Sequence, residues 1–122
     1  YENFKYILTK KGYKPADIEK MINNAIIDFS LEKIRDEKVK NIRIEDKYIL
    51  SLIRLSFRKL DLLLVDNIFD EISDVYIDAI LSMIKKLKTS DTTLILACTR
   101  PEIAEKICKR KIYFEHGKIV DQ

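Results

Sequence analysis

The residue with the clearest potential for chemistry is Asp66, which ends the apolar run Leu62–Val65. An uninterrupted apolar run is typical of a strand buried in a parallel sheet, and such sheets bind ligands beyond the carboxyl ends of their strands. A carboxylate at that edge can hold Mg²⁺, usually through water, beside a nucleotide phosphate. The alternative is structural, because many buried strands end in Asp where the next loop starts. Taken alone, the pattern favours this structural interpretation.

The two cysteines and the single histidine give weaker indications of a chemical role than Asp66 does. Cys98 and Cys108 have neither the number nor the spacing of a disulfide framework or a metal site. No histidine lies where it could activate Cys98, so both thiols are interpreted as small buried residues. His116 adjoins Gly117 in a predicted turn, where it is expected to be exposed. A single histidine excludes a His-based metal cluster, and two glycines exclude a glycine-rich phosphate loop within these 122 residues.

Composition narrows the class of protein. A chain of 122 residues has the length of one domain, and a hydrophobic fraction of 47% argues against intrinsic disorder. Lys and Arg number 23 against 20 Asp and Glu, and the resulting charge of +3 is too small to imply a nucleic-acid partner. No apolar run approaches the ~18 residues of a membrane span, and no signal peptide is visible.

The first half of the chain is predicted to be helical. Apolar residues recur at helical spacing over residues 1–11 and again over 15–29, with Gly12 ending the first helix and Pro15 opening the second. Residues 30–41 are charged and aperiodic, so we expect a short helix and a loop. A third helix is predicted over residues 45–59. Its inward positions would be Ile49, Leu52, Ile53 and Ser56.

The second half alternates strands with helices. Buried strands are predicted over residues 61–66 and 92–98, and helices over 74–88 and 101–108. Two short strands, 111–115 and 118–120, would be joined by the turn-forming pair His116 and Gly117. This alternation indicates an α/β fold with a parallel sheet. The chain therefore divides into a helical part, residues 1–60, and an α/β part, residues 61–122.

Four segments of the chain together carry a resemblance to a known family. They are Leu62–Asp66, residues 92–97, the Pro101–Ala104 and 115–120 pair, and Tyr1–Phe4. The first three resemble the Walker B strand, the strand entering the switch-histidine loop and the closing segment of an ABC-transporter nucleotide-binding domain. The last is similar to the segment after the Q-loop in FtsE-type, lipoprotein-release and MacB-type ATPases, and the FtsE-type cell-division ATPases are the most similar. The resemblance covers essentially all 122 residues.

This resemblance implies a fold and a function. The fold would be a helical subdomain followed by the C-terminal part of a RecA-like parallel sheet of the P-loop NTPase class, and so an incomplete domain. Such domains imply ATP binding and hydrolysis at a dimer interface, and a membrane permease subunit as partner, here FtsX-like. The family's Walker A loop lies upstream of Tyr1. Mg-ATP would therefore be a cofactor of the complete protein and is not expected to bind this stretch tightly.

The family's signature loop falls on residues 42–46 of this chain. No glycine is present there, although glycines let the backbone approach a phosphate. The charges of Glu45 and Asp46 would instead repel phosphate, which predicts loss of the signature function. Arg54 falls on an arginine of the family's signature helix, but an arginine on a helix is more often simply solvated.

The positions that perform hydrolysis in the family also differ. Asn67 stands at the catalytic Glu position, and an amide cannot act as a base at neutral pH. Asp70 or Glu71 could replace that carboxylate only from a misplaced position. Thr99 stands at the switch-histidine position, where it can donate a hydrogen bond but carries no charge. Arg100 beside it could contact a phosphate or could be a surface residue before Pro101.

Three functions follow. The first is a catalytically impaired ABC-type subunit, cytoplasmic and peripheral on the inner face of the cell membrane, that couples to a permease. Its docking face would comprise five residues of the helical part, although these could instead only pack that part together. The five are Phe4, Tyr6, Ile7, Tyr48 and Phe57.

The second function is an active ATPase, completed by an upstream Walker A segment or by a competent partner subunit. The third is a stand-alone interaction module in which the strand Leu62–Val65 lacks neighbours and presents an unpaired edge. In that case the chain would form a homodimer or exchange segments with a second copy.

Overall fold

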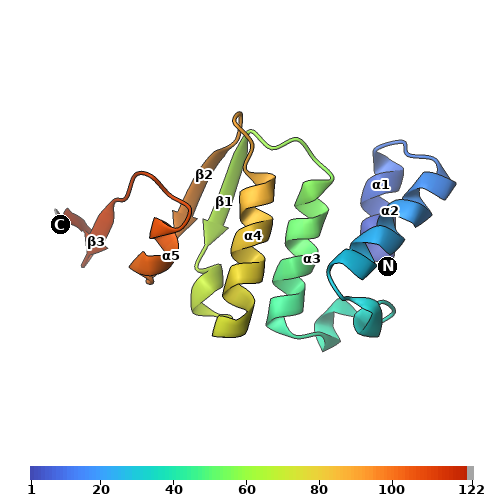
Figure 1. Cartoon of the computed structure of the whole chain (residues 1–122), viewed down its shortest axis with the longest axis horizontal. Coiled ribbons are helices and arrows are strands. Elements are labelled where there is room, and N and C mark those ends of the chain that lie inside the picture. The colour runs from blue at the N-terminus through green and yellow to red at the C-terminus, as the bar shows by residue number, and fades with distance from the viewer. Residues whose placement is uncertain (121–122) are drawn as a thin grey trace.

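The computed structural model describes residues 1–120. Its elements follow one another along the long axis, from a pair of helices at the N-terminal end to a small hairpin at the other (Figure 1). The pair consists of α1 (Glu2–Lys10) and α2 (Pro15–Asp28), and both predicted helices are confirmed. Gly12, in the turn between them, has a φ of +81°, a conformation that glycine adopts without a Cβ clash.

The periodic apolar residues of these helices form the predicted buried stripes. Phe4, Ile7 and Leu8 are buried on α1. The buried positions of α2 are Ile18, Ile22, Ala25 and Ile26. Residues 30–41 contain two single 3₁₀ turns, Glu32–Ile34 and Val39–Asn41, instead of the expected short helix.

The third helix, α3, spans Ile44–Ser56 and buries Ile49, Leu52 and Ile53 as predicted. Two details of the prediction were wrong. The helix ends three residues earlier than expected, and the carbonyl of Phe57 just beyond it accepts a hydrogen bond from Lys11. Ser56 does not face the core, because its hydroxyl donates to the carbonyl of Ile53 (2.7 Å) on an exposed side of the helix.

Two parallel strands form the centre of the α/β part. They are β1 (Leu62–Asp66) and β2 (Thr93–Ala97), paired so that Leu62 lies opposite Thr93 and Asp66 opposite Ala97. The connection from β1 to β2 runs through two 3₁₀ turns, Ile68–Asp70 and Asp74–Tyr76, and then through the helix α4 (Ile77–Leu87). The structure thus confirms a mixed α/β arrangement with a parallel strand pair.

Only one face of this strand pair is covered. Leu63 and Val65 point into the core, whereas on the opposite face Leu62, Leu64 and Ile95 are 49%, 65% and 57% exposed. The prediction that both strands are buried was therefore wrong for the outer face, because the helices α3 and α4 pack on the inner side alone. We call the outer residues Leu62, Leu64 and Ile95 the open sheet face.

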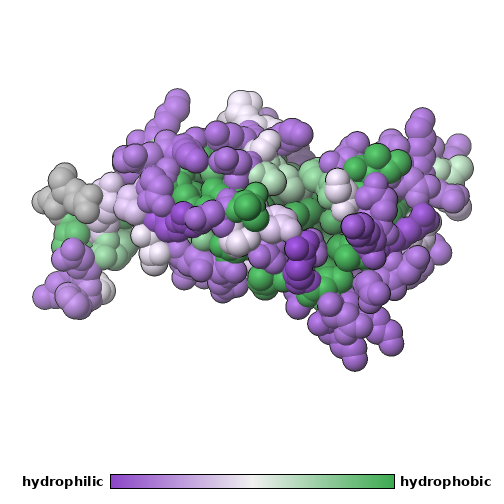
Figure 2. All heavy atoms as spheres, turned by 60° about the horizontal axis from the view of Figure 1, so that its bottom comes forward, coloured by the Kyte–Doolittle hydropathy of each residue, from purple (hydrophilic) through white to green (hydrophobic). Residues whose placement is uncertain are grey.

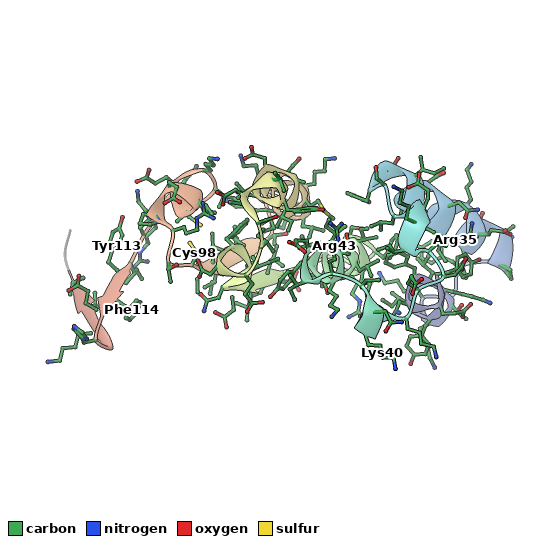
Figure 3. The ribbon with its side chains drawn as sticks, turned by 90° about the horizontal axis from the view of Figure 1, so that it is seen from below. Arg35, Lys40, Arg43, Cys98, Tyr113 and Phe114 are labelled. Atoms are coloured by element: carbon green, nitrogen blue, oxygen red, sulfur yellow. The ribbon has the colours of Figure 1, made fainter. Side chains whose placement is uncertain are left out.

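The last 20 residues described contribute a short helix and a hairpin. The helix α5 (Pro101–Glu105) is shorter than predicted, and β3 (Tyr113–Glu115) pairs with β4 (Lys118–Val120) in an antiparallel manner. The turn residues His116 and Gly117 have φ angles of +46° and +77°, as a two-residue hairpin turn requires. Side chains of the hairpin, including the labelled Phe114, extend away from the rest of the chain (Figure 3).

A single hydrophobic core joins the two parts of the chain. It includes buried residues from α1 through α5, and α3 packs directly against α4. Phe4 of α1 meets Phe57 edge to face, with ring centroids 6.0 Å apart. The division into residues 1–60 and 61–122 stays a prediction, since the core is continuous across that boundary. None of the described helices is long and apolar enough to cross a membrane.

Polar surface surrounds this core unevenly. Figure 2 shows hydrophilic residues over much of one face, interrupted by apolar patches over the middle of the molecule and at the hairpin. The hairpin contributes Phe114 and Ile119 as large exposed apolar side chains, and Ile112 just before β3 is also exposed.

The core predicts a contrast between two phenylalanines. Phe69 is fully buried, and Phe69→Ala is expected to lower the free energy of unfolding by about 3–5 kcal/mol because it leaves a cavity. The matched control Phe114→Ala removes the same ring from a position that is 66% exposed, and should change it by no more than about 0.5 kcal/mol. Urea unfolding followed by circular dichroism measures both, and equal effects would contradict the assigned core.

Candidate functional site

The parallel register brings three of the predicted site residues to one edge. Asp66 ends β1 opposite Ala97 of β2, and the backbone N–H of Asn67 donates to the carbonyl of Ala97 (3.0 Å). Thr99 follows two residues after Ala97. Asp66, Asn67 and Thr99 therefore lie together beyond the carboxyl ends of the two strands, where open parallel sheets bind ligands. Their roles in nucleotide chemistry stay predictions.

Asn67 forms the corner between β1 and the following 3₁₀ turn. Its backbone is left-handed, with φ of +51° and ψ of +15°, and its carbonyl accepts from the N–H of Asp70 (3.0 Å). Asn adopts this conformation more readily than most residues with a side chain. A glutamate at this position would carry backbone strain, so the local fold favours the amide that stands there.

Asp70 is committed to Thr99. One carboxylate oxygen accepts from the Thr99 hydroxyl (2.7 Å), and the other from the Thr99 backbone N–H (3.2 Å). The next residue, Glu71, accepts a hydrogen bond from the hydroxyl of Tyr48. Both carboxylates considered as substitutes for the catalytic Glu thus hold protein groups. Asp70 instead fastens the loop after β2 to the loop after β1.

Arg100 is likewise paired within the chain. Its guanidinium contacts Asp74 (2.9 Å) and Glu102 (3.0 Å), and the hydrogen bond that it donates to Asp74 raises the pKa of Arg100. The two carboxylates neutralise the positive charge of the Arg100 guanidinium, which a phosphate would need for binding. The geometry favours the structural alternative for Arg100, a surface residue that links α5 to the turn before α4.

The residues at the predicted position of the signature loop, 42–46, include the start of the helix α3. Residues 44–46 form the first turn of α3, and Asp46 is only 6% exposed. Its carboxylate pairs with Arg43 at 3.0 and 3.2 Å, and the expected repulsion of phosphate stays a prediction. This hydrogen bond raises the pKa of Arg43, whose guanidinium also lies 5.4 Å from the ring centre of Tyr76. Figure 3 shows Arg43 beside α3, on the side of α4.

The predicted docking face is divided between core and surface. Tyr6 is 66% exposed, whereas Phe4 and Ile7 are buried and Tyr48 and Phe57 are partly buried. Phe4 packs on Phe57, so these two residues hold the helical part together. A docking role for this region stays a prediction, with Tyr6 as the one large exposed member of the set.

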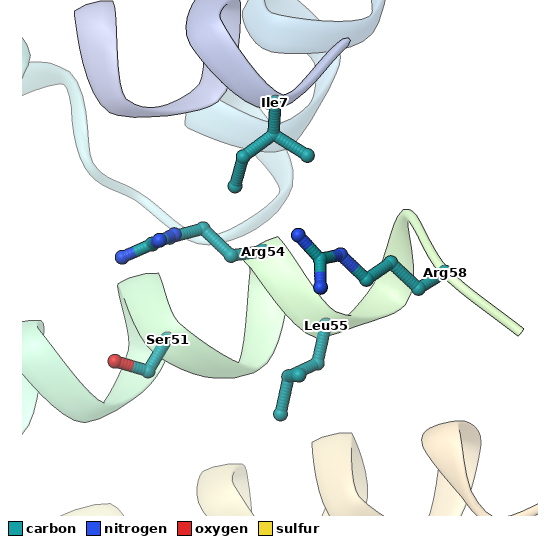
Figure 4. A pocket seen from close by; sticks show the side chains of 5 residues that line it. All are labelled: Ile7, Ser51, Arg54, Leu55 and Arg58. Carbon is teal, nitrogen blue, oxygen red and sulfur yellow. The ribbon is translucent and has the colours of Figure 1, made fainter. Parts of the chain in front are cut away.

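A hollow lies between α1 and the C-terminal half of α3 (Figure 4). It has a volume of about 220 Å³, and we call it the α1–α3 hollow. Its lining residues are Ile7, Ser51, Arg54, Leu55 and Arg58. Arg58 was not among the predicted site residues, although its spacing of four residues from Arg54 was a signal that the two could share one side of the helix.

The cysteines and possible metal ligands add no second site. The Cys98 thiol donates to the carbonyl of Arg100 (3.4 Å), and partial burial raises the pKa of the Cys108 thiol. Within residues 1–120 no group of three or more His, Cys, Asp or Glu side chains could hold a metal ion. A role of Asp66 in holding Mg²⁺ stays a prediction.

Comparison with known proteins shows a distant similarity to a curated protein. The chain is 24% identical over 112 residues to a protein of Caldanaerobacter subterraneus subsp. tengcongensis that is named as an ABC transporter ATP-binding protein. The match covers 92% of this chain and 46% of that protein, so the chain spans about half the length of its relative. No protein-family model matches the chain, and no solved structure matches it significantly. The similarity supports part of an ABC-type ATP-binding protein and does not distinguish the FtsE type.

The hydrogen bond between Tyr48 and Glu71 predicts an unusual titration. It raises the pKa of Tyr48 from its ordinary value near 10 to about 12. The stabilisation is thus fully present below pH 10 and is lost as the pH rises through 12. Tyrosinate absorbance should show one of the six tyrosines titrating late, and that step should be absent in Tyr48→Phe and move toward lower pH in Glu71→Gln. Unchanged titration in both variants would contradict the contact.

Proposed function

We propose that this chain is part of an ABC-transporter ATP-binding subunit, FtsE-like, that is catalytically impaired and acts by coupling to an FtsX-like membrane permease subunit. The similarity to the ABC-type relative supports the class. The subunit would lie at the inner face of the cell membrane. Because the chain spans about half of that relative, the activity of the whole protein is part of the proposal.

The observation that carries the proposal is which side chains stand at the edge beyond the carboxyl ends of β1 and β2. Hydrolysis needs a base next to the strand-ending Asp, and Asn67 stands there in a left-handed backbone conformation. The nearest alternative carboxylate, Asp70, is held by Thr99, which itself occupies the switch-histidine position. These two observations support the impaired assignment, because the residue after Asp66 is an amide and the carboxylate of Asp70 already holds Thr99.

A weak nucleotide role remains compatible with this edge. If the complete protein binds Mg-ATP, Asp66 is the residue of this chain that would hold the ion through water, and the ion would offset phosphate charge. Asn67 could then orient a water molecule but could not deprotonate it. An active ATPase, completed upstream or by a competent partner subunit, is the alternative within the same class.

Turnover of ATP by the longest natural form of the protein tests the proposal. We expect the wild-type rate to equal that of Asp66→Asn, because no hydrolysis depends on this edge. Asp61→Asn is the matched control, since it makes the same charge change at the exposed residue just before β1. Turnover that disappears in Asp66→Asn and persists in Asp61→Asn would overturn the impaired assignment and establish an active ATPase.

The open sheet face favours one candidate from a different class, the self-associating interaction module. Within residues 1–120, β1 and β2 form a sheet of two strands, and three large aliphatic side chains on its outer face contact solvent. Exposed strand edges with an apolar face are typical of segments that pair with another chain. A homodimer or a segment exchange through this face would cover them.

Light scattering of the chain at high micromolar concentration tests this candidate. If it holds, the chain is a dimer and Leu64→Glu shifts it to a monomer, because the added carboxylate would lie in the apolar contact. Val75→Glu is the matched control, since Val75 is also largely exposed and lies outside the open sheet face. A monomeric wild-type chain, or equal effects of the two variants, would contradict self-association through β1 and β2.

A further inference from the structure

The hairpin formed by β3 and β4 presents an uncovered apolar face. Phe114 lies opposite Ile119 in the strand pairing, so the two side chains share one side of the hairpin, and each is 66% exposed. Ile112, two residues before Phe114, is 51% exposed. Within residues 1–120, the hydrophobic core includes no residue of β3 or β4, and Figure 1 shows the hairpin beyond α5 at one end of the long axis. We call Ile112, Phe114 and Ile119 the hairpin face.

Exposed cations surround the hairpin face. Residues 109–120 contain four Lys or Arg against one Glu. Three of the cations, at residues 109–111, directly precede the hairpin face, and the fourth, Lys118, lies in β4. Lys111 pairs with Glu105 at 3.1 Å, whereas no ion pair within residues 1–120 involves the other three. The hairpin thus combines large apolar side chains with positive charge that the described part of the chain leaves largely unpaired.

The sign of the neighbouring charges distinguishes the hairpin face from the open sheet face. The strand that carries Leu62 and Leu64 has the exposed acids Asp61 and Asp66 at its two ends, so an anionic surface would be repelled there. At the hairpin face the neighbouring charges are mostly positive. Of the two uncovered apolar surfaces, the hairpin face is therefore the one that complements an anionic surface.

A second protein suits the hairpin face less well than a lipid bilayer does. A second copy docked face to face would bring two sets of cations together. Three side chains also cover only part of the roughly 800 Å² that each partner buries in a stable protein complex. A bilayer accepts a few apolar side chains below its headgroups, while anionic headgroups attract the cations beside them.

We propose that the hairpin inserts its apolar face into the surface of an anionic lipid bilayer. Phe114 and Ile119 would lie at the boundary between headgroups and acyl chains, and the cations at residues 109–111 and 118 would contact the anionic headgroups. Because the hairpin stands apart from the core, this contact leaves the packing of the helices on β1 and β2 unchanged.

This inference goes beyond the proposed function, in which a permease subunit holds the protein at the membrane. The contact proposed here is with the lipid itself, and it is measured on vesicles that contain no permease. The two assignments can fail separately, because vesicle binding depends on the hairpin face and ATP turnover on the edge beyond β1 and β2.

Co-sedimentation of the longest natural form of the protein with lipid vesicles tests the proposal. We expect binding to vesicles of phosphatidylcholine and phosphatidylserine, and much weaker binding to phosphatidylcholine alone. Lys109→Gln/Arg110→Gln should weaken binding about thirtyfold, because each cation near an anionic surface contributes a factor of about five. The matched control Lys85→Gln/Lys86→Gln, with the same charge change at exposed residues of α4, should bind as the wild type does.

Phe114 tests the insertion of the apolar side chains. Phe114→Ala should weaken vesicle binding about tenfold, because a ring no longer leaves water, whereas Val75→Ala, at a position that is 83% exposed and outside the hairpin, should not. The 122 residues contain no tryptophan, so Phe114→Trp gives this chain a single indole. Its fluorescence should shift to the blue on vesicles and be quenched by brominated acyl chains, and that of Val75→Trp should do neither.

Three results would overturn the proposal: no binding to phosphatidylserine vesicles, equal binding to phosphatidylcholine alone, or equal losses in the control variants. A protein dimer that disappears in Phe114→Ala, without binding to vesicles, would also overturn it and assign the hairpin face to a second copy.

Discussion

The parallel pairing of β1 with β2 is the constraint on which the other features depend. Its register sets Asp66 opposite Ala97, and the hydrogen bond from Asn67 to the Ala97 carbonyl continues the pairing into the loop. That register places the two loops side by side, so Asp70 can reach Thr99, 29 residues away. The same pairing turns Leu63 and Val65 toward α3 and α4 and leaves Leu64 outside. One set of backbone hydrogen bonds thus determines both the candidate site and the open sheet face.

Several of the polar groups that were predicted to act on a nucleotide have partners in the chain instead. Asp46 pairs with Arg43, Asp70 with Thr99, and Arg100 with Asp74. Unpaired, these groups would be available to a phosphate or to water. Paired, they hold loops and helix ends in place. Contacts of this kind give these side chains a structural role in the fold.

Local pattern was enough to predict most elements, because helical period, proline at a helix start and a two-residue turn are short-range signals. Pattern could not predict that the run Leu62–Val65 is covered on one face only, since that depends on where α3 and α4 pack. It also missed the contacts of Tyr48 with Glu71 and of Asp70 with Thr99, which join residues more than 20 positions apart. The pairing of Arg43 with Asp46 was accessible from their spacing of three residues. The inward placement of Ser56 was wrong because a hydroxyl can bond its own helix.

The register of β1 and β2 can be tested by cross-linking on the open sheet face. In a variant with Cys98 and Cys108 replaced by serine, Leu64→Cys/Ile95→Cys places two thiols at paired positions of neighbouring strands, whose separation suits a disulfide. Leu62→Cys/Ala97→Cys, on the same face but offset by four residues, is too far apart at about 13 Å. The account predicts rapid intramolecular oxidation of the first pair and none of the second. Oxidation of the offset pair alone, or of neither, would contradict the strand pairing from which the site and the function are argued.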